Sequence, residues 1–200
     1  PPVGDLDVTV VAGGVGAARF LRALAPVVPA ARTAAVVNTG DDTVLHGLSI
    51  SPDLDTLVYT LAGAIDPERG WGLAGESWNA MDALGRYAAV RPEGSGAAPT
   101  WFNLGDRDLA THLFRTARLA EGARPTTVAA EIASAWGVAV RLLPMTDGRF
   151  ATRVVLADTG EEVSFQDYFV RLRHGVPVRS IRFDADGAGP HDEKRLRDFL

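Results

Sequence analysis

DVTVVAGGVGAAR, residues 7–19, places an apolar, β-branched run directly before three closely spaced glycines. Asp7–Ala12 predicts a buried strand, and Ala17–Leu24 has the composition of a helix. Between them, Gly13, Gly14 and Gly16 bring backbone N–H groups and the positive end of a helix dipole to one point, without side chains that would obstruct a ligand. The stretch therefore predicts a diphosphate-binding turn. A tight strand–helix turn that binds no ligand is the alternative.

Two familiar phosphate-binding patterns fit this turn less well. Arg19 stands where the dinucleotide fingerprint G-x-G-x-x-G requires its last glycine, and Asn38 stands where a ribose-binding carboxylate is expected. An NAD-dependent oxidoreductase is therefore the weakest functional hypothesis. The G-K-[ST] ending of a P-loop is absent, which excludes that pattern.

A second continuous apolar run, Thr33–Val37, predicts another strand that is covered on both faces, as in a parallel sheet. After Arg149, Thr152–Ala157 and Glu162–Phe165 predict a β-hairpin, and Ser180–Phe183 predicts a further strand. Pro190 is expected to begin a final helix. The predicted class is α/β and Rossmann-like, with a mostly parallel sheet, helices on both faces, a helical insertion and a β-hairpin.

Three segments, expected to form a single structural unit, divide the chain. Residues 1–65 are the predicted nucleotide-binding core, 66–150 a mainly helical insertion on the substrate side, and 151–200 a return to the core. A doubly wound sheet seldom ends on a helix with no strand to follow, so the C-terminal part is expected to be missing.

Three further helices are predicted. The first has Ser51 as N-cap, Pro52 in the first helical position and Asp53 at the positive end of the dipole. It repeats apolar residues at helical spacing: Leu54, Leu57, Val58 and Leu61. Residues 106–121 and 127–136 are the other two.

Composition limits the function classes. The chain has 200 residues, 46% of them hydrophobic, and a formal charge of −5, with no basic cluster that would bind a nucleic-acid backbone. It has no cysteine, which excludes disulfides and thiolate metal sites. No apolar run is long enough to cross a bilayer, and no targeting leader is recognisable, so the expected location is the cytoplasm.

The stretch NTGDD, residues 38–42, follows the second predicted strand at the edge where ligand crevices open in α/β sheets. Paired carboxylates beside a diphosphate suit a hard cation such as Mg²⁺. Asp41 and Asp42 are thus candidate ligands. A solvated Asx turn is the alternative.

Two more aspartates lie on the helix that begins at Pro52. Asp53 is largely explained by the helix dipole. Asp55 lies at the border of the apolar stripe, where its carboxylate either points into a cleft or pairs with an arginine.

The stretch WFNLGDRDLATH, residues 101–112, offers an anion-binding helix start with Arg107 beside it. Asp106 is equally suited to cap that helix, and Arg107 to pair with Asp108. His112, with no obvious partner in the sequence, is more typical of a surface or packing position than of a base.

Four motifs in this order resemble the 2-phospho-L-lactate transferases and their actinobacterial phosphoenolpyruvate-transferring relatives. They are residues 13–19 (GGVGAAR), 36–42 (VVNTGDD), 51–56 (SPDLDT) and 104–112 (LGDRDLATH). Residues 66–72 (DPERGWG) resemble an element of the actinobacterial branch. Members of the family are longer and carry a Ser-Asn-Pro nucleotide-binding segment beyond the part matched here.

The resemblance implies a transferase of coenzyme F-420 biosynthesis. A guanosine diphosphate ester of enolpyruvate or lactate would bind through its diphosphate, and the deazaflavin precursor Fo would attack the phosphorus that bears the acid, releasing GMP. Mg²⁺ would be held by Asp41 and Asp55, which are also the implied catalytic residues. The implied substrate- and nucleotide-binding residues are Gly13, Gly14, Gly16, Asn38, Asp42, Asn103, Asp106 and Arg107.

One non-enzymatic alternative comes from a related family of similar fold, whose members bind uridine diphosphate-sugars and regulate metabolism. Such a regulator would share the glycine turn but would need neither Asp55 nor a deazaflavin pocket. The expected partners are small molecules, not nucleic acid or membrane, and a homodimer is the general expectation.

Overall fold

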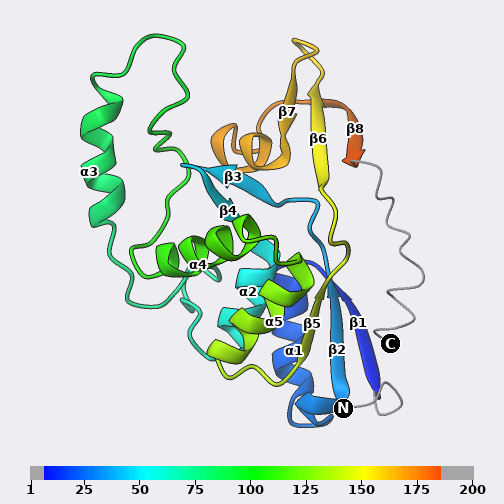
Figure 1. The fold of residues 1–200 in the computed structure, drawn as a ribbon. Helices are drawn as coiled ribbons and strands as arrows, with labels where there is room; N and C mark the ends of the chain where they lie inside the picture. The colour runs from blue at the N-terminus through cyan, green and yellow to red at the C-terminus, as the bar shows by residue number, and fades with distance from the viewer. Residues whose placement is uncertain (1–6, 186–200) are drawn as a thin grey trace.

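A parallel three-stranded sheet forms the centre of the computed structural model, which describes residues 7–185 (Figure 1). Its strands are β1 (Val8–Ala12), β2 (Thr33–Val37) and β5 (Arg141–Pro144), in the order β1-β2-β5. All strand pairs are parallel, and β2 in the middle buries four of its five side chains. The strands predicted at the glycine turn and at Thr33–Val37 are confirmed.

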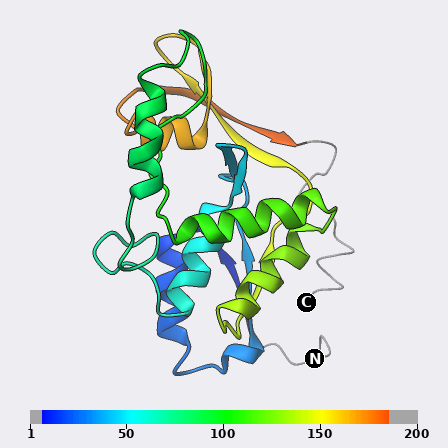
Figure 2. The same ribbon diagram turned by 60° about the vertical axis from the view of Figure 1, so that its left-hand side comes forward.

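One layer of helices covers a face of this sheet (Figure 2). Helix α1 (Val15–Leu24) contacts α2 (Pro52–Leu61), and α2 contacts α5 (Pro125–Ala135). Both crossovers advance in the same direction along the sheet, and right-handed crossovers then place their helices on the same side. The main hydrophobic core lies between this layer and the strands.

The α/β, Rossmann-like class is confirmed, but the helices in contact with the sheet in residues 7–185 do not cover both faces as expected. On the other face the side chain of Val11 is 89% exposed. The sequence also gave no sign of β5, whose short Arg-Leu-Leu-Pro run follows helix α5 closely.

A second, antiparallel sheet stands above the core (Figure 1). Strand β6 (Phe150–Leu156) pairs with β7 (Glu162–Ser164) in the predicted hairpin and with β8 (Val178–Ala185) on its other side. A π-helix (Asp167–Arg171) joins β7 to the last strand. The hairpin and the strand at Ser180–Phe183 are confirmed, whereas the helix expected from Pro190 lies outside the described residues.

Short elements flank β2 and precede the predicted insertion. A two-stranded hairpin, β3 (Thr43–Leu45) with β4 (Leu48–Ile50), precedes α2, and a 3₁₀ turn (Ala30–Arg32) precedes β2. Helix α3 (Asn79–Ala88) extends to one side, and α4 (Asp108–Ala120) lies across the bundle (Figure 1). The division into three segments stays a prediction. No helix of residues 7–185 has the length and hydrophobicity to cross a membrane.

The loop before α4 links α3 to α4 by two reciprocal caps. The carboxylate of Glu76 accepts hydrogen bonds from the backbone N–H groups of Arg107 and Asp108, both at 2.9 Å. In return, the Asp106 carboxylate accepts them from the N–H groups of Asn79 and Ala80 at the start of α3, at 3.0 and 2.9 Å. The N-terminal amides expected to bind an anion are therefore already paired within the chain.

Truncating Glu76 to alanine is expected to lower the free energy of unfolding by about 1–2 kcal/mol, because two N–H groups at the start of α4 lose their cap. Urea unfolding monitored by circular dichroism measures the change. Glu93→Ala, an exposed carboxylate in the 91–100 loop, is the matched control. Equal effects of the two substitutions would contradict the cap.

Candidate functional site

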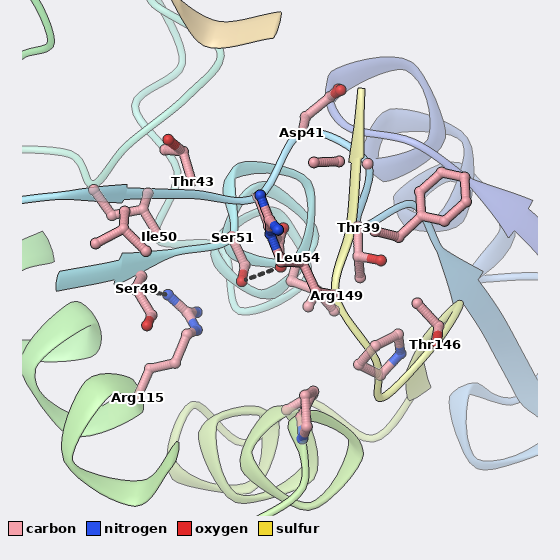
Figure 3. A pocket seen from close by; sticks show the side chains of 18 of the residues that line it. Thr39, Asp41, Thr43, Ser49, Ile50, Ser51, Leu54, Arg115, Thr146 and Arg149 are labelled. Carbon is pink, nitrogen blue, oxygen red and sulfur yellow. Dashed lines mark hydrogen bonds between the residues drawn. The ribbon is translucent and has the colours of Figure 1, made fainter. Parts of the chain in front are cut away.

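A cavity of about 420 Å³ lies where the carboxyl end of β2 meets the second sheet (Figure 3). One wall is polar and comes from the loop after β2 and from the first turn of α2. The opposite wall is apolar and comes from α5 and the end of α4. The residues of the two walls that matter below are Thr39, Gly40, Asp41, Asp42, Ser51, Asp55, Arg115, Val128, Ala129 and Ile132.

Asn38 organises the loop after β2. Its Nδ2 donates hydrogen bonds to Asp41 Oδ2 at 3.3 Å and to Asp53 Oδ2 at 2.9 Å, and its Oδ1 accepts one from the N–H of Gly40 at 3.0 Å. Strand β6 also contacts this loop, because the N–H of Thr152 donates a hydrogen bond to the carbonyl of Gly40 at 2.7 Å. Asn38 thus brings two carboxylates together.

Gly40 is required by this close approach. A Cβ built on Gly40 would lie 2.8 Å from Thr152 Oγ1 and 3.0 Å from Asn38 Oδ1. A side chain at position 40 would have to displace the side chain of Thr152 or of Asn38.

Asp53 joins the glycine turn to the aspartate loop. A Cβ on Gly14 would lie 2.6 Å from Asp53 Oδ1, and one on Gly13 would lie 3.7 Å from Asp53 Oδ2. A Cβ on Gly16 would have no heavy atom within 4 Å. The absent side chain at Gly14 therefore leaves room for a carboxylate beside the turn, whereas a Cβ on Gly13 would make only an ordinary contact. From the sequence, Asp53 is largely explained by the helix dipole, and its place beside the glycine turn is not predicted.

Three carboxyl groups of this cluster hold protons more tightly than isolated aspartates do. Burial, with the nearby charge of Asp53, raises the pKa of Asp41 to about 6. Burial also raises the pKa of Asp53. Asp42 is exposed to the solvent in the cavity but enclosed by protein on its other sides, and this enclosure raises its pKa to about 7 despite a hydrogen bond from Ser51 Oγ at 2.9 Å.

Asp55 has a different environment. Its side chain is 5% exposed, and both its oxygens face the guanidinium of Arg115 on α4, with Nη1 to Oδ2 at 3.1 Å and a second, shorter contact from Nη2 to Oδ1. Arg115 Nη1 also points to the carbonyl of Ser49 at 3.3 Å (Figure 3). Both alternatives open for Asp55 hold, because it pairs with an arginine and also lines the cavity.

The network continues behind Arg115. His112 Nδ1 lies 3.2 Å from Arg115 Nη1, and His112 Nε2 lies 3.4 Å from Asp108 Oδ2. Tyr59 donates from its hydroxyl to Asp108 Oδ1 at 2.5 Å. Burial alone would raise the pKa of Asp108, but its contacts with His112 and Tyr59 outweigh burial and hold that pKa below the usual value.

The predicted site residues therefore fall into three groups. Asp41, Asp42 and Asp55 line the cavity. Gly13, Gly14 and Asn38 lie around Asp53, which does not line the cavity, and Asn38 also bonds Asp41, which does. Gly16, Asn103, Asp106 and Arg107 do not line it. Asp106 and Arg107, which were expected to bind substrate, make structural contacts in this chain. Asp106 caps α3, and Arg107 Nη1 donates a hydrogen bond to the carbonyl of Ala74 at 2.7 Å.

Two clusters have the chemistry of a metal site. Asp55, Asp108 and His112 each offer a ligand atom, and these atoms lie within 4.8 Å of one another. However, Arg115 already supplies a positive charge there. Asp41 and Asp53 share the amide of Asn38; burial raises the pKa of both, and the charge of Asp53 raises that of Asp41 further. Their oxygens fit a hard divalent ion.

These raised pKa values predict a pH-dependent stability. Because the folded chain holds protons that the unfolded chain releases above pH ~4, the metal-free chain should lose stability as the pH rises from about 5 to about 8. Mg²⁺ binds the deprotonated carboxylates, so it should raise the melting temperature more at the higher pH. Scanning calorimetry with and without Mg²⁺ measures both effects. An equal response to Mg²⁺ at both pH values would contradict the site.

Comparison with known sequences agrees with the arrangement of these motifs. Residues 8–195 match the family described as 2-phospho-L-lactate transferase CofD. The chain is 45% identical over 195 residues to a phosphoenolpyruvate transferase of Nocardia farcinica, covering 94% of this chain and 56% of that protein. Proteins of the same name from Mycobacterium tuberculosis and Streptomyces coelicolor are each 44% identical, with 89% and 88% of this chain covered and 56% and 53% of theirs.

Among solved structures, the chain resembles a UPF0052-family protein from Bacillus halodurans with a TM-score of 0.56 and 16% identity, covering 98% of this chain and 56% of that chain. That likeness concerns the fold alone. The chain spans little more than half the length of the relatives it matches. Four ordered motifs, a match over nearly the whole chain and relatives at this identity together show that the chain belongs to the 2-phospho-L-lactate transferase family.

Proposed function

We propose that the chain carries the acceptor side and the diphosphate turn of a transferase that moves a phosphoenolpyruvyl or phospholactyl group from a guanosine diphosphate ester to Fo. The observation that supports this most is the convergence, through Asn38 and Asp53, of the glycine turn and the aspartate loop beside a cavity with one apolar wall. The names of the actinobacterial relatives favour enolpyruvate as the transferred acid.

In this proposal the diphosphate lies on the backbone N–H groups of Gly13, Gly14 and Gly16. Asp41 and Asp53 would hold Mg²⁺, which would neutralise negative charge on the diphosphate. The expectation that Asp55 is the second ligand stays a prediction, and the geometry favours Asp53 because Arg115 already neutralises Asp55.

The cavity would take the acceptor. Its apolar wall of Val128, Ala129 and Ile132 suits the flat ring system of a deazaflavin, and the polar wall suits a ribityl chain. Asp55, fixed by Arg115, would accept a hydrogen bond from the terminal hydroxyl and orient it. The hydroxyl oxygen forms a bond to the phosphorus that bears the acid, the bond from that phosphorus to the bridging oxygen breaks, and GMP leaves with the electron pair while the hydroxyl proton is released.

Two titrations test the proposal against the regulator alternative. Fo fluorescence should be quenched or shifted as the chain is added, and GDP should bind more tightly with Mg²⁺ present. A transfer assay with the donor ester, Mg²⁺ and Fo then follows product by chromatography. Binding of a uridine diphosphate-sugar without any binding of Fo would overturn the transferase and favour a regulator.

A further inference from the structure

His112 is a buried titratable side chain that the proposed reaction does not use. It lies on α4 and is 1% exposed, behind Arg115 as viewed from the cavity wall. Its two ring nitrogens meet groups of different kinds: a guanidinium at Nδ1 and a carboxylate at Nε2. These partners determine which nitrogen carries the proton.

The Nδ1 side is decided by Arg115. A guanidinium has only donors, so the 3.2 Å contact between Arg115 Nη1 and His112 Nδ1 is a hydrogen bond only if Nδ1 carries a lone pair. A proton on Nδ1 would point toward a cation. An N–H on Nδ1 would need an acceptor, and the nearby Asp55 Oδ2 is 3.7 Å from Nδ1, beyond hydrogen-bond distance.

The Nε2 side is consistent with the same tautomer. Asp108 Oδ2 lies 3.4 Å from Nε2 as its nearest ionic partner, and Nε2 makes no hydrogen bond among the described residues. The other oxygen of Asp108 is engaged by the Tyr59 hydroxyl at 2.5 Å. An N–H on Nε2 therefore faces a carboxylate that Tyr59 holds in place.

We propose that His112 is a positioning residue of the cavity: protonated on Nε2 alone, it accepts a hydrogen bond from Arg115 and thereby fixes the guanidinium that orients Asp55. The proposal rests on the proposed function, in which Asp55 holds the acceptor hydroxyl. The two hydrogens of Arg115 Nη1 are then shared among three acceptors, on Ser49, Asp55 and His112. Without the third, Arg115 and Asp55 keep their ion pair but lose one constraint on its orientation.

The tautomer is tested directly on the chain as it is. A two-dimensional ¹⁵N–¹H spectrum of the histidine rings at neutral pH should show His112 with an unprotonated Nδ1, and adding Mg²⁺ or Zn²⁺ should leave it unchanged. A protonated Nδ1 would overturn the proposal. A shift on adding metal would do so as well, since it would make His112 a ligand with Asp55 and Asp108.

Two substitutions test the role. In His112→Asn the amide oxygen can replace the Nδ1 acceptor, whereas His112→Gln places its amide nearer to Asp108. Fo affinity should stay within about twofold for Asn and fall about tenfold for Gln, the loss of one hydrogen bond to a charged group, equivalent to ~1.4 kcal/mol. Leu113→Asn, at an exposed position of the same helix, controls for the lower helix propensity of asparagine.

The melting temperatures of the His112→Asn and His112→Gln variants show whether a loss of Fo affinity comes from a loss of folding stability or from a loss of positioning. If Asn and Gln weaken Fo binding equally, or if neither does, His112 has no positioning role. Failure of the unsubstituted chain to bind Fo would instead count against the proposed function, and the ring spectrum would still decide the tautomer.

Discussion

Replacing Arg115 by methionine is expected to lower the free energy of unfolding by about 3–5 kcal/mol, the cost of leaving one partner of a buried ion pair uncompensated. The Asp55 carboxylate is 5% exposed, and in the variant both its oxygens would lose the guanidinium. Burial alone would lower the pKa of Arg115, but the charge of Asp55 outweighs it and raises that pKa, which identifies the pair as mutually dependent.

A control on the same helix makes this prediction specific. Arg118 pairs with Glu131 and Glu121 at the surface, so Arg118→Met should cost less than about 1 kcal/mol. The double substitution Asp55→Asn with Arg115→Met should recover part of the loss, because position 55 then carries no charge that needs the guanidinium. Urea unfolding gives all three values. Similar losses for Arg115→Met and Arg118→Met would show that burial of the pair has no energetic consequence.

Local sequence signals predicted those parts of the fold that local interactions determine. The glycine turn, the apolar run of β2 and the start of α2 at Pro52 all carry such signals, and they formed as predicted. The hairpin of β3 and β4 was missed because its turn is formed by His46 at φ 55° and Gly47 at φ 75°, without the usual Asn-Gly or Asp-Gly pair. Strand β5 was missed because four residues ending in proline give almost no periodicity.

The sequence predicted those residues of the candidate site whose role can be recognised from their own short segment of the chain. Asp41, Asp42 and Asp55 were found from the strand end and from the helix stripe, and they line the cavity. Glu76 could not be found in this way, because it caps a helix that begins more than thirty residues later in the chain. The anion site expected at Asp106 and Arg107 depended on backbone N–H groups that already donate hydrogen bonds to the Glu76 carboxylate.

Arg115 was missed although the sequence carried a signal for it. Asp108, His112 and Arg115 recur at helical spacing on one face of α4, and they join Tyr59 and Asp55 in one buried polar cluster. A polar stripe on a helix is usually read as its solvent face, and only the tertiary contacts show that this one is turned inward.

Replacing Asp53 by asparagine is expected to have a large effect on Mg²⁺-dependent GDP binding. Asp53→Asn keeps the shape of the side chain and an oxygen that can accept from Asn38, but it removes the charge beside Gly13 and Gly14. We expect the Mg²⁺-dependent part of GDP binding to weaken about a hundredfold, the upper end of what the loss of a residue that supports a metal site costs. Calorimetric titration of GDP with and without Mg²⁺ measures it, and GDP affinity without the metal should change much less.

A matched variant distinguishes this role from an interaction with the helix dipole. Asp82 lies in the first turn of α3 as Asp53 lies in the first turn of α2, so a dipole effect alone would make the two asparagine substitutions equivalent, at about 0.3–1 kcal/mol of stability each. The site requires Asp82→Asn to leave GDP binding unchanged. It also requires Asp53→Asn to reduce the fall in stability between pH ~5 and ~8, since one of the repelling carboxylates is then gone. If Asp53→Asn behaves like Asp82→Asn in both measurements, the cation is not held at the junction of the turn and the aspartate loop.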